Sequence, residues 1–281
     1  MQDLTEEKLR QLENKALQIR RLLIKTLTEA KSGHTAGSLG MADVFTSMYF
    51  HILNHNPKKP DWEERDRLVL SNGHICPVQY VALALSGYFP VGELETLRRL
   101  NSRLQGHPHR TSLPGIETTS GPLGEGLGEA IGIALTGGLD NKKHYVYCLT
   151  SDGEHDEGST WEAIMFAAKH KLNNLIEIVD RNNIQIGGNT EKVMPLNTLR
   201  EKYESFNWAV LEINGNSIVE IIESIRRAKT IENKPVVIIA HTIPGKGVSF
   251  MENDYKWHGK TPSPIEMEKA LKELDKLEIR N

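Results

Sequence analysis

The chain has 281 residues and a formal net charge of −3, so it is long enough to bury a large α/β core and has no overall attraction for nucleic acid. It shows no basic stripe with interleaved aromatic residues, which argues against polynucleotide binding. It has only two cysteines, no stretch as long as a membrane span and a charged amphipathic N-terminus. We therefore expect no disulfide framework, no membrane insertion and a cytoplasmic location.

The first part of the chain is predicted to be mainly helical. Apolar residues recur at three- and four-residue steps from Leu9 to Leu27, which predicts a helix that ends near Ser32-Gly33. This helix would deliver His34 to the loop that follows it. Met41 to Asn54 is predicted to form a second helix.

The rest of the chain alternates strands and helices. Predicted strands cover residues 67–70, 145–149, 175–179, 209–213 and 235–240. Predicted helices cover residues 130–139, 159–170 and 218–229, with Ser159 as an N-cap. This alternation indicates an α/β fold with a doubly wound, mainly parallel sheet flanked by helices. Because no repeat or linker interrupts it, we expect one domain over residues 1–281.

A polar run follows each of two consecutive predicted strands. These runs are Ser151-Asp152-Gly153-Glu154 and Asp180-Arg181-Asn182-Asn183. A strand, a helix and a strand in this length form a βαβ unit, and its right-handed crossover brings both strand ends to one edge of the sheet. Asp152 and Asn182 are therefore predicted to face one another.

These residue types suit a divalent cation that carries a diphosphate. Mg²⁺ prefers oxygen ligands, and the Asp152 carboxylate, the Asn182 amide oxygen and the Ile184 backbone carbonyl are candidates; Ca²⁺ or Mn²⁺ would serve as well. Gly153 would let a phosphate approach the main chain closely. Asp-Gly and Asn-Asn are each common in turns, so it is their pairing across the βαβ unit that favours a function.

Histidines beside glycines form a second group of candidates. A neutral imidazole in a loop can bind sugar hydroxyls, donate to a phosphate or move a proton. The candidates in predicted loops are His34, His74, His107 and His258. The histidines in helix or strand-edge contexts, for which a solvated or internally satisfied ring is expected, are His51, His55, His144 and His170.

Taken together, the motifs resemble the transketolase family. The Asp-Gly and downstream Asn resemble the thiamine diphosphate motif of that family, usually written Gly-Asp-Gly followed by an Asn. The other matching segments occur in the same order and with similar spacing: Lys31-Ser-Gly-His34, Leu70-Ser-Asn-Gly-His74, Gly106-His-Pro108, Thr119-Ser-Gly-Pro-Leu-Gly-Glu-Gly126 and His258-Gly259. The resemblance covers nearly the whole chain and implies the thiamine-diphosphate-binding fold, in its diphosphate-type domain.

The resemblance also implies roles for the histidines. His34 and His258 would be catalytic, contacting the sugar substrate and assisting proton movement. His258 would also contact the cofactor, and His74 would touch the cofactor's phosphate side. His107 would line the substrate channel.

The resemblance also implies that two loops contact the cofactor. Asp152, Asn182 and Ile184 would hold the metal. The other implied cofactor contacts are Gly121, Pro122, Leu123, Gly153 and Glu154, with the last expected on the rim of its loop beside His155 and Asp156. Glu157 matches a family glutamate in an acid cluster between subunits, so we expect it to support the site rather than act as a base.

The sequence departs from the family pattern in two loops. Ser151 replaces the first Gly of Gly-Asp-Gly, and Thr35-Ala36 replaces a Pro after His34. The second change lies in a substrate-facing loop. The sequence therefore leaves open which ketose is the donor and which aldose is the acceptor.

In full-length transketolases, a glutamate that promotes the reactive form of the cofactor lies in a second, pyrimidine-binding domain. This sequence matches one domain only. The resemblance therefore implies the N-terminal subunit of a split transketolase, which would join a C-terminal subunit carrying the pyrimidine domain in an α2β2 assembly. That assembly would transfer a two-carbon ketol unit between sugar phosphates, as in the pentose phosphate pathway.

Three alternatives share some of these motifs. One is the α-subunit of a 2-oxo acid dehydrogenase, and another is a fragment similar to 1-deoxyxylulose-phosphate synthase. The third is a non-catalytic paralogue that only binds the partner. The Ser-Gly-His and Gly-Pro-Leu-Gly segments argue against the first, and the intact Asp152, Asn182 and loop histidines argue against the third.

Overall fold

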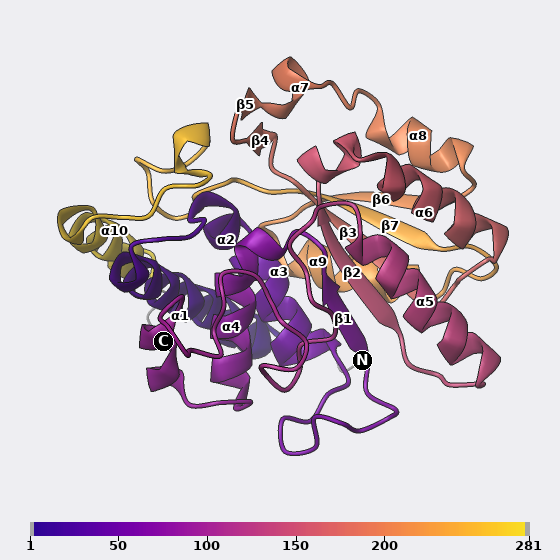
Figure 1. Ribbon diagram of the computed structural model, residues 1–281, viewed down its shortest axis with the longest axis horizontal. Helices are drawn as coiled ribbons and strands as arrows, with labels where there is room; N and C mark the ends of the chain where they lie inside the picture. Colours follow the sequence, from indigo (N-terminus) through magenta and orange to yellow (C-terminus); the bar gives the residue numbers. More distant parts are fainter. Residues whose placement is uncertain (1–2, 279–281) are drawn as a thin grey trace.

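The computed structural model describes residues 3–278, and its centre is a five-stranded parallel sheet (Figure 1). The strand order is β1-β2-β3-β7-β6. The strands are β1 (Arg67–Leu70), β2 (Val146–Ser151), β3 (Leu175–Arg181), β6 (Ala209–Asn214) and β7 (Val236–His241). Every predicted strand is present within one or two residues of its expected bounds.

Helices cover both faces of the sheet, which confirms the doubly wound α/β fold. One face carries α5 (Gly126–Leu139), α6 (Gly158–Lys169) and α8 (Leu199–Ser205). The other face carries α1 (Glu6–Ala30), α3 (Ala42–Ser47), α4 (Cys76–Ser86) and α9 (Ile218–Ala228), and α10 (Pro264–Lys276) packs on α1. None of the helices in residues 3–278 combines the length and the apolar character that crossing a membrane requires.

Side chains along the central strands alternate between two hydrophobic clusters. On β2, Val146 and Cys148 join the cluster under α5, α6 and α8, whereas Tyr147 and Leu149 join the cluster on the opposite face. This is the two-residue period of a strand. Both faces of β2 are therefore buried, as its apolar sequence predicts.

The helix predicted over Met41 to Asn54 is wrong in its bounds and continuity. The chain forms α2 (Ala36–Gly40), then α3, then a π-helical turn η1 (Met48–Ile52). Met41 leaves helical geometry with ψ at 2°. Gly40 passes so close to another segment that an added Cβ would lie 3.0 Å from the carbonyl oxygen of Ile243. The close contact between Gly40 and the backbone of Ile243 therefore coincides with the interruption of the helix at Met41.

The predicted Ser159 N-cap is also wrong. Helix α6 begins at Gly158, and Glu157 occupies the N-cap with extended backbone angles and no side-chain hydrogen bond to the helix. The predicted helices at 130–139 and 218–229 are confirmed, although α5 starts earlier at Gly126.

Several elements were not predicted from the sequence. Helix α4 is buried on nearly all sides, so it lacks the polar face that reveals a surface helix. The other unpredicted elements are the hairpin strands β4 (Ile184–Gln185) and β5 (Gly188–Asn189), the helices α7 (Thr190–Val193), α8 and α10, and the short turns η2 (Gly73–Ile75), η3 (Val91–Thr96), η4 (Gly153–Asp156) and η5 (Tyr255–Trp257).

The polar motifs follow the carboxyl ends of strands. β1 leads into η2 with His74, β2 into η4, β3 into the β4–β5 hairpin, and β7 into the segment that reaches η5 and His258. Since these strands are parallel, the motifs gather at one edge of the sheet (Figure 1).

Candidate functional site

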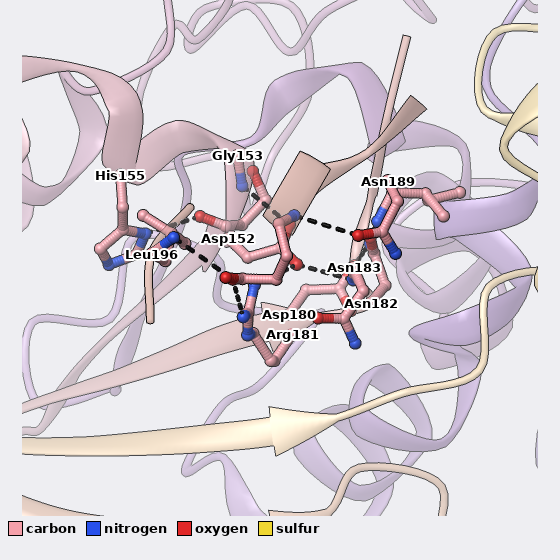
Figure 2. Close-up of polar contacts among 12 residues, drawn as sticks. Asp152, Gly153, His155, Asp180, Arg181, Asn182, Asn183, Asn189 and Leu196 are labelled. Atoms are coloured by element: carbon pink, nitrogen blue, oxygen red, sulfur yellow. Dashed lines mark hydrogen bonds and ion pairs between the residues drawn. The ribbon is translucent and has the colours of Figure 1, made fainter. Parts of the chain in front are cut away.

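Asp152 joins the two predicted polar runs. Its side chain is fully buried, and Ser151 before it pairs in register with Asp180 of β3. One carboxylate oxygen, Oδ1, accepts the backbone N–H of Gly153 at 2.7 Å. The other, Oδ2, accepts the backbone N–H of Asn183 at 2.6 Å and lies 3.2 Å from Nη1 of Arg181 (Figure 2). The crossover therefore brings the two runs into contact.

Asn182 is oriented by its neighbours in the same place. Its Oδ1 accepts the backbone N–H of Ile184 at 3.0 Å, and its Nδ2 donates to Asp180 at 2.7 Å. The other carboxylate oxygen of Asp180 accepts the hydroxyl of Thr242, which follows β7. We call Asp152, Asp180, Arg181 and Asn182 the carboxylate cluster.

Burial governs the charge of this cluster. It raises the pKa of Asp152 to about 6, although the Arg181 guanidinium opposes the shift. Burial also raises the pKa of Asp180 to about 7, and the charge of Asp152 adds to that effect. Asp152 thus has one guanidinium neighbour, Arg181, and a second buried carboxyl group, Asp180, acts on it electrostatically, so a further cation at Asp152 would be electrostatically favoured.

The donor set fits a small hard cation. Within residues 3–278, no three His, Cys, Asp or Glu side chains gather as a metal cluster, so a metal here would have one carboxylate with amide, carbonyl, phosphate and water oxygens. Mg²⁺ accepts such a set, because it usually keeps water and phosphate ligands beside one or two carboxylates. Asp152 accepts the backbone N–H of Asn183 and therefore lies against the segment that carries Asn182 and Ile184, the other two candidate oxygen donors.

The expected rim position of Glu154 and His155 is wrong. Both side chains are buried, with 0% and 1% of their surface exposed. The Glu154 carboxylate accepts the hydroxyl of Ser71, the backbone N–H of Gly124 at 2.7 Å and that of Ser151 at 3.2 Å. It therefore ties the Asp152 loop to the glycine-rich loop before α5. Asp156 is exposed, as expected.

The loop histidines come together from distant parts of the chain. The ring centroids of His34 and His74 lie 4.8 Å apart, those of His34 and His258 5.4 Å, and those of His74 and His258 5.2 Å. His107 lies beside them, close enough to affect the titration of His34 and His74. We call these four residues the histidine cluster.

The histidine cluster is uncharged at neutral pH. Burial lowers the pKa of His34 to about 4, with His258, Arg98 and His107 adding to the shift. Burial lowers the pKa of His74 further below its ordinary range, and it also lowers the pKa of His258. Each ring therefore has one donor and one acceptor nitrogen.

Buried polar atoms without partners lie in the segments of the histidine cluster. Within residues 3–278, no hydrogen-bond partner is found for Nδ1 of His34, both polar side-chain atoms of Asn72 or the hydroxyl of Ser120. Asn72 is completely buried. Since buried polar groups in folded proteins are almost always satisfied, such orphans fit a site completed by a ligand.

The glycine-rich loop borders this cluster. A Cβ added at Gly121 would lie 3.9 Å from the His107 ring, while Pro122 is exposed and Leu123 is half-buried. Gly124 has φ of +84°, and a Cβ there would lie 2.7 Å from the Cβ of Glu157. Only glycine fits this close approach, which brings Glu157 against the loop.

The histidines expected to be structural differ among themselves. The His55 ring is satisfied by the Tyr88 hydroxyl and the Tyr49 carbonyl, and the His170 ring lies tilted against Phe166 with the ring centroids 4.3 Å apart. His144 is neither solvated nor satisfied, since it is buried and neither ring nitrogen has a hydrogen-bond partner.

Comparison with known proteins agrees with this geometry. The family model described as "Transketolase, thiamine diphosphate binding domain" matches residues 12–275. The chain belongs to the transketolase family. This confirms the resemblance carried by the motifs.

Relatives of two lengths share this transketolase domain. An apulose-4-phosphate transketolase subunit of Phocaeicola vulgatus is 40% identical over 93% of this chain and 94% of its own length. The "6-deoxy-6-sulfo-D-fructose transketolase subunit SqwG" of Clostridium sp. is also 40% identical, over 94% of this chain and 96% of its own. The solved transketolase from Leishmania mexicana superposes with a TM-score of 0.89 at 32% identity, covering 94% of this chain. The chain spans 41% of that protein's length.

Proposed function

We propose that the chain is the N-terminal, thiamine-diphosphate-binding subunit of a two-subunit transketolase. The assembly would transfer a two-carbon ketol unit from a ketose or its phosphate to an aldose or its phosphate. The single observation that carries this proposal is that distant segments assemble a buried carboxylate cluster and a cluster of neutral histidines. The match to separate transketolase subunits over almost their whole length supports it. We further propose that residues 1–281 form one domain.

The carboxylate cluster would hold the diphosphate end of the cofactor. Asp152, the amide oxygen of Asn182 and the carbonyl of Ile184 would hold Mg²⁺, or Ca²⁺ or Mn²⁺ in its place. An added Cβ at Gly153 would lie 3.7 Å from the side chain of Gln185, in ordinary van der Waals contact, and the absence of a side chain at Gly153 would let a phosphate approach the main chain. Thiamine diphosphate would supply the carbon nucleophile and the electron sink for ketol transfer.

The histidine cluster would act on the sugar. Neutral rings at His34 and His258 can take a proton from a substrate hydroxyl and return it, because each has a free acceptor nitrogen in one tautomer. His74 is the most deeply buried of the three that contact one another and would face the cofactor's phosphate side. His107 is exposed and would contact the substrate where it enters. Leu123 would make only van der Waals contact with the aminopyrimidine ring of the cofactor.

A second polypeptide would complete the active site. Relatives of the same length as this chain are named as subunits of transketolases, which supports the existence of a partner. That partner would carry the pyrimidine-binding domain in an α2β2 assembly. Glu157 is exposed in this chain, which is compatible with a role at a contact between the two polypeptides. The cytoplasm is the proposed location, where ketose and aldose phosphates would be the substrates.

Reconstitution tests the proposal. The chain and the product of a neighbouring reading frame that encodes a pyrimidine domain are purified separately. They are then assayed alone and mixed, with Mg²⁺, thiamine diphosphate, a ketose phosphate donor and a panel of aldoses. Ketol transfer is expected only from the mixture. Full transfer by the chain alone would refute the split arrangement, and pyruvate decarboxylation without ketol transfer would favour a 2-oxo acid dehydrogenase.

A further inference from the structure

Glu154 is a buried carboxyl group that takes no part in the proposed proton transfers. It lies in η4 after β2, and 0% of its surface is exposed. Its oxygens accept hydrogen bonds from three segments of the chain. Oε1 accepts the hydroxyl of Ser71 and the backbone N–H of Gly124 at 2.7 Å, and Oε2 accepts the backbone N–H of Ser151 at 3.2 Å. A single side chain therefore connects the turn after β1, the glycine-rich loop and the loop that carries Asp152.

The hydroxyl of Ser71 extends this connection. The backbone N–H of Gly126 can only donate, and it lies 3.1 Å from the Ser71 hydroxyl oxygen. That oxygen therefore accepts from Gly126, while the hydroxyl hydrogen is donated to Glu154. The glycine-rich loop is thus held at two points, at Gly124 by Glu154 and at Gly126 by Ser71.

Close packing fixes the same arrangement. A Cβ added at Gly126 would lie 2.5 Å from the Ser71 hydroxyl oxygen and 2.6 Å from the Ser71 Cα, and a Cβ added at Gly124 would lie 2.5 Å from the hydroxyl oxygen of Ser159. Contacts this short would force neighbouring atoms apart, so both positions need glycine. The glycine-rich loop therefore lies directly against Ser71 and against the first turn of α6.

Two of the connected segments carry residues that would meet opposite ends of the cofactor. Ser151 directly precedes Asp152, the proposed metal ligand at the diphosphate end. Gly124 directly follows Leu123, the proposed contact of the aminopyrimidine ring. The spacing between these two contacts is therefore set across the Glu154 side chain.

The third segment leads to the histidine cluster. The Ser71 carbonyl accepts the backbone N–H of Gly73 at 2.7 Å, and the 3₁₀ turn η2 that begins at Gly73 carries His74. Ser71 and the adjacent Asn72 are both fully buried, so neither can move without its surroundings. A displacement of Ser71 would therefore be passed on to His74.

Removal of the Glu154 carboxylate would leave its donors buried without an acceptor. Such a loss is unfavourable, because each donor has already given up its hydrogen bond to water. The N–H groups of Gly124 and Ser151 and the hydroxyl of Ser71 would regain partners only if the three segments moved apart. The carboxylate therefore holds the segments at their present spacing.

We propose that Glu154 is a positioning residue: it sets the spacing between the carboxylate cluster, the glycine-rich loop and the turn that carries His74, and it acts on the cofactor through these segments. The inference rests on the proposed function for the identity of the cofactor. The spacing itself rests on the hydrogen bonds and the packing of the chain.

Calorimetry with two probes separates this role from a purely structural one. The probes are thiamine diphosphate and inorganic diphosphate, each with Mg²⁺ and with the chain bound to its partner. Ser71→Ala keeps the contact between Glu154 and Ser151, so inorganic diphosphate should bind within about twofold of the unmodified protein, whereas thiamine diphosphate should bind about tenfold more weakly. Glu154→Ala should weaken the binding of both probes by about tenfold or more.

The matched control is Asp156→Asn, which alters an exposed side chain of the same turn and should bind both probes normally. Lower melting temperatures in Ser71→Ala and Glu154→Ala, with normal binding of both probes, would show a structural role only and overturn the proposal. Equal weakening of both probes by Ser71→Ala would also overturn it, because the glycine-rich loop would then have no separate effect on the ring end of the cofactor.

Amide hydrogen exchange tests the spacing without a cofactor. In the full chain, Glu154→Ala should raise the exchange rate of residues 71–75 and 121–126 by about tenfold, whereas Asp156→Asn should leave both segments unchanged. Glu154→Gln replaces one acceptor oxygen by a donor and should speed exchange in at least one of these segments, which covers the case in which the alanine variant fails to fold. Unchanged exchange in both segments would overturn the proposal. If the unmodified protein with its partner binds no thiamine diphosphate, the proposed function fails, while the exchange rates still decide whether Glu154 holds the segments together.

Discussion

The carboxylate cluster and the histidine cluster lie at the same edge of the sheet but are built in opposite ways. Both oxygens of Asp152 and of Asp180, and both polar atoms of Asn182, already have partners within the chain. In the histidine cluster the rings of His34, His74 and His258 contact one another, and Nδ1 of His34 has no partner among residues 3–278. The first cluster is therefore preorganised by the chain itself, whereas the second keeps polar atoms that the described residues do not satisfy.

We predict from this difference that the two clusters divide cofactor binding and turnover between them. Preorganised oxygens cost little to arrange when a cation arrives, so the carboxylate cluster should dominate cofactor affinity. Unpartnered imidazoles gain their hydrogen bonds only from a substrate or cofactor, so the histidine cluster should dominate the rate. Substitutions in each cluster test this division.

The largest effect is expected at Asp152. Asp152→Asn keeps the shape but removes the buried negative charge that would face the metal, so binding of Mg²⁺ and thiamine diphosphate should weaken by about 100-fold or more. Calorimetry on the chain with its partner measures this. Asp156→Asn, four residues later on the exposed rim, is the matched control and should bind normally. Equal affinities for the two variants would contradict the assignment of Asp152 as a metal ligand.

The next largest effect is expected at the histidines. His34→Asn and His258→Asn should each lower kcat of the reconstituted enzyme by about 100-fold, since each removes a group that can transfer a proton. Cofactor affinity should change little, because the carboxylate cluster is intact. His170→Asn, which alters an exposed ring that contacts Phe166, is the control. A loss of cofactor binding without a change in kcat would reverse the proposed division between the clusters.

Sequence patterns predicted the layout of this edge well. The β-branched strands at 145–149 and 175–179 and the helix between them were sufficient to place Asp152 beside the second polar run, because a βαβ unit has few possible arrangements. The glycines beside the histidines correctly marked segments that converge. In contrast, the partners that orient these residues, such as Thr242 and Arg181, depend on register and side-chain packing, which no local motif specifies.

The errors have a common physical cause. Glu154 and His155 are polar residues after a strand, which ordinarily lie on a surface, yet here they are buried because Ser71, Gly124 and Tyr203 satisfy them. The kink at Met41 is associated with a close contact at Gly40 from a segment about two hundred residues away. Long-range contacts of this kind override local propensity.

A smaller effect is expected from Arg181, which tests whether its guanidinium competes with a metal ion for the Asp152 carboxylate. Its guanidinium contacts Asp152 and Glu191, so a metal at Asp152 must share an oxygen with it or displace it. Arg181→Leu should therefore raise the affinity for Mn²⁺ alone by about threefold to tenfold, while lowering thermal stability without metal. Paramagnetic resonance of Mn²⁺ measures the affinity. Arg181→Lys keeps the charge and should resemble the unmodified chain, and weaker Mn²⁺ binding by Arg181→Leu would show that the guanidinium supports the site.

The smallest effect expected is a pair of pH dependences of opposite sign, one from His34 and one from Glu177, which is buried in β3. His34 titrates near 6.5 when unfolded and near 4 when folded, so the unfolded chain binds the extra proton and stability falls as the pH decreases through that window. Glu177 titrates near 4.5 when unfolded and near 8 when folded, so the folded chain holds the extra proton and stability falls as the pH rises through that range. In urea unfolding between about pH 5 and pH 8, His34→Gln should reduce the acid loss and Glu177→Gln the alkaline loss. Because glutamine carries no titrating proton at either site, an unchanged pH slope in one variant would show that the corresponding group keeps its ordinary pKa in the folded chain.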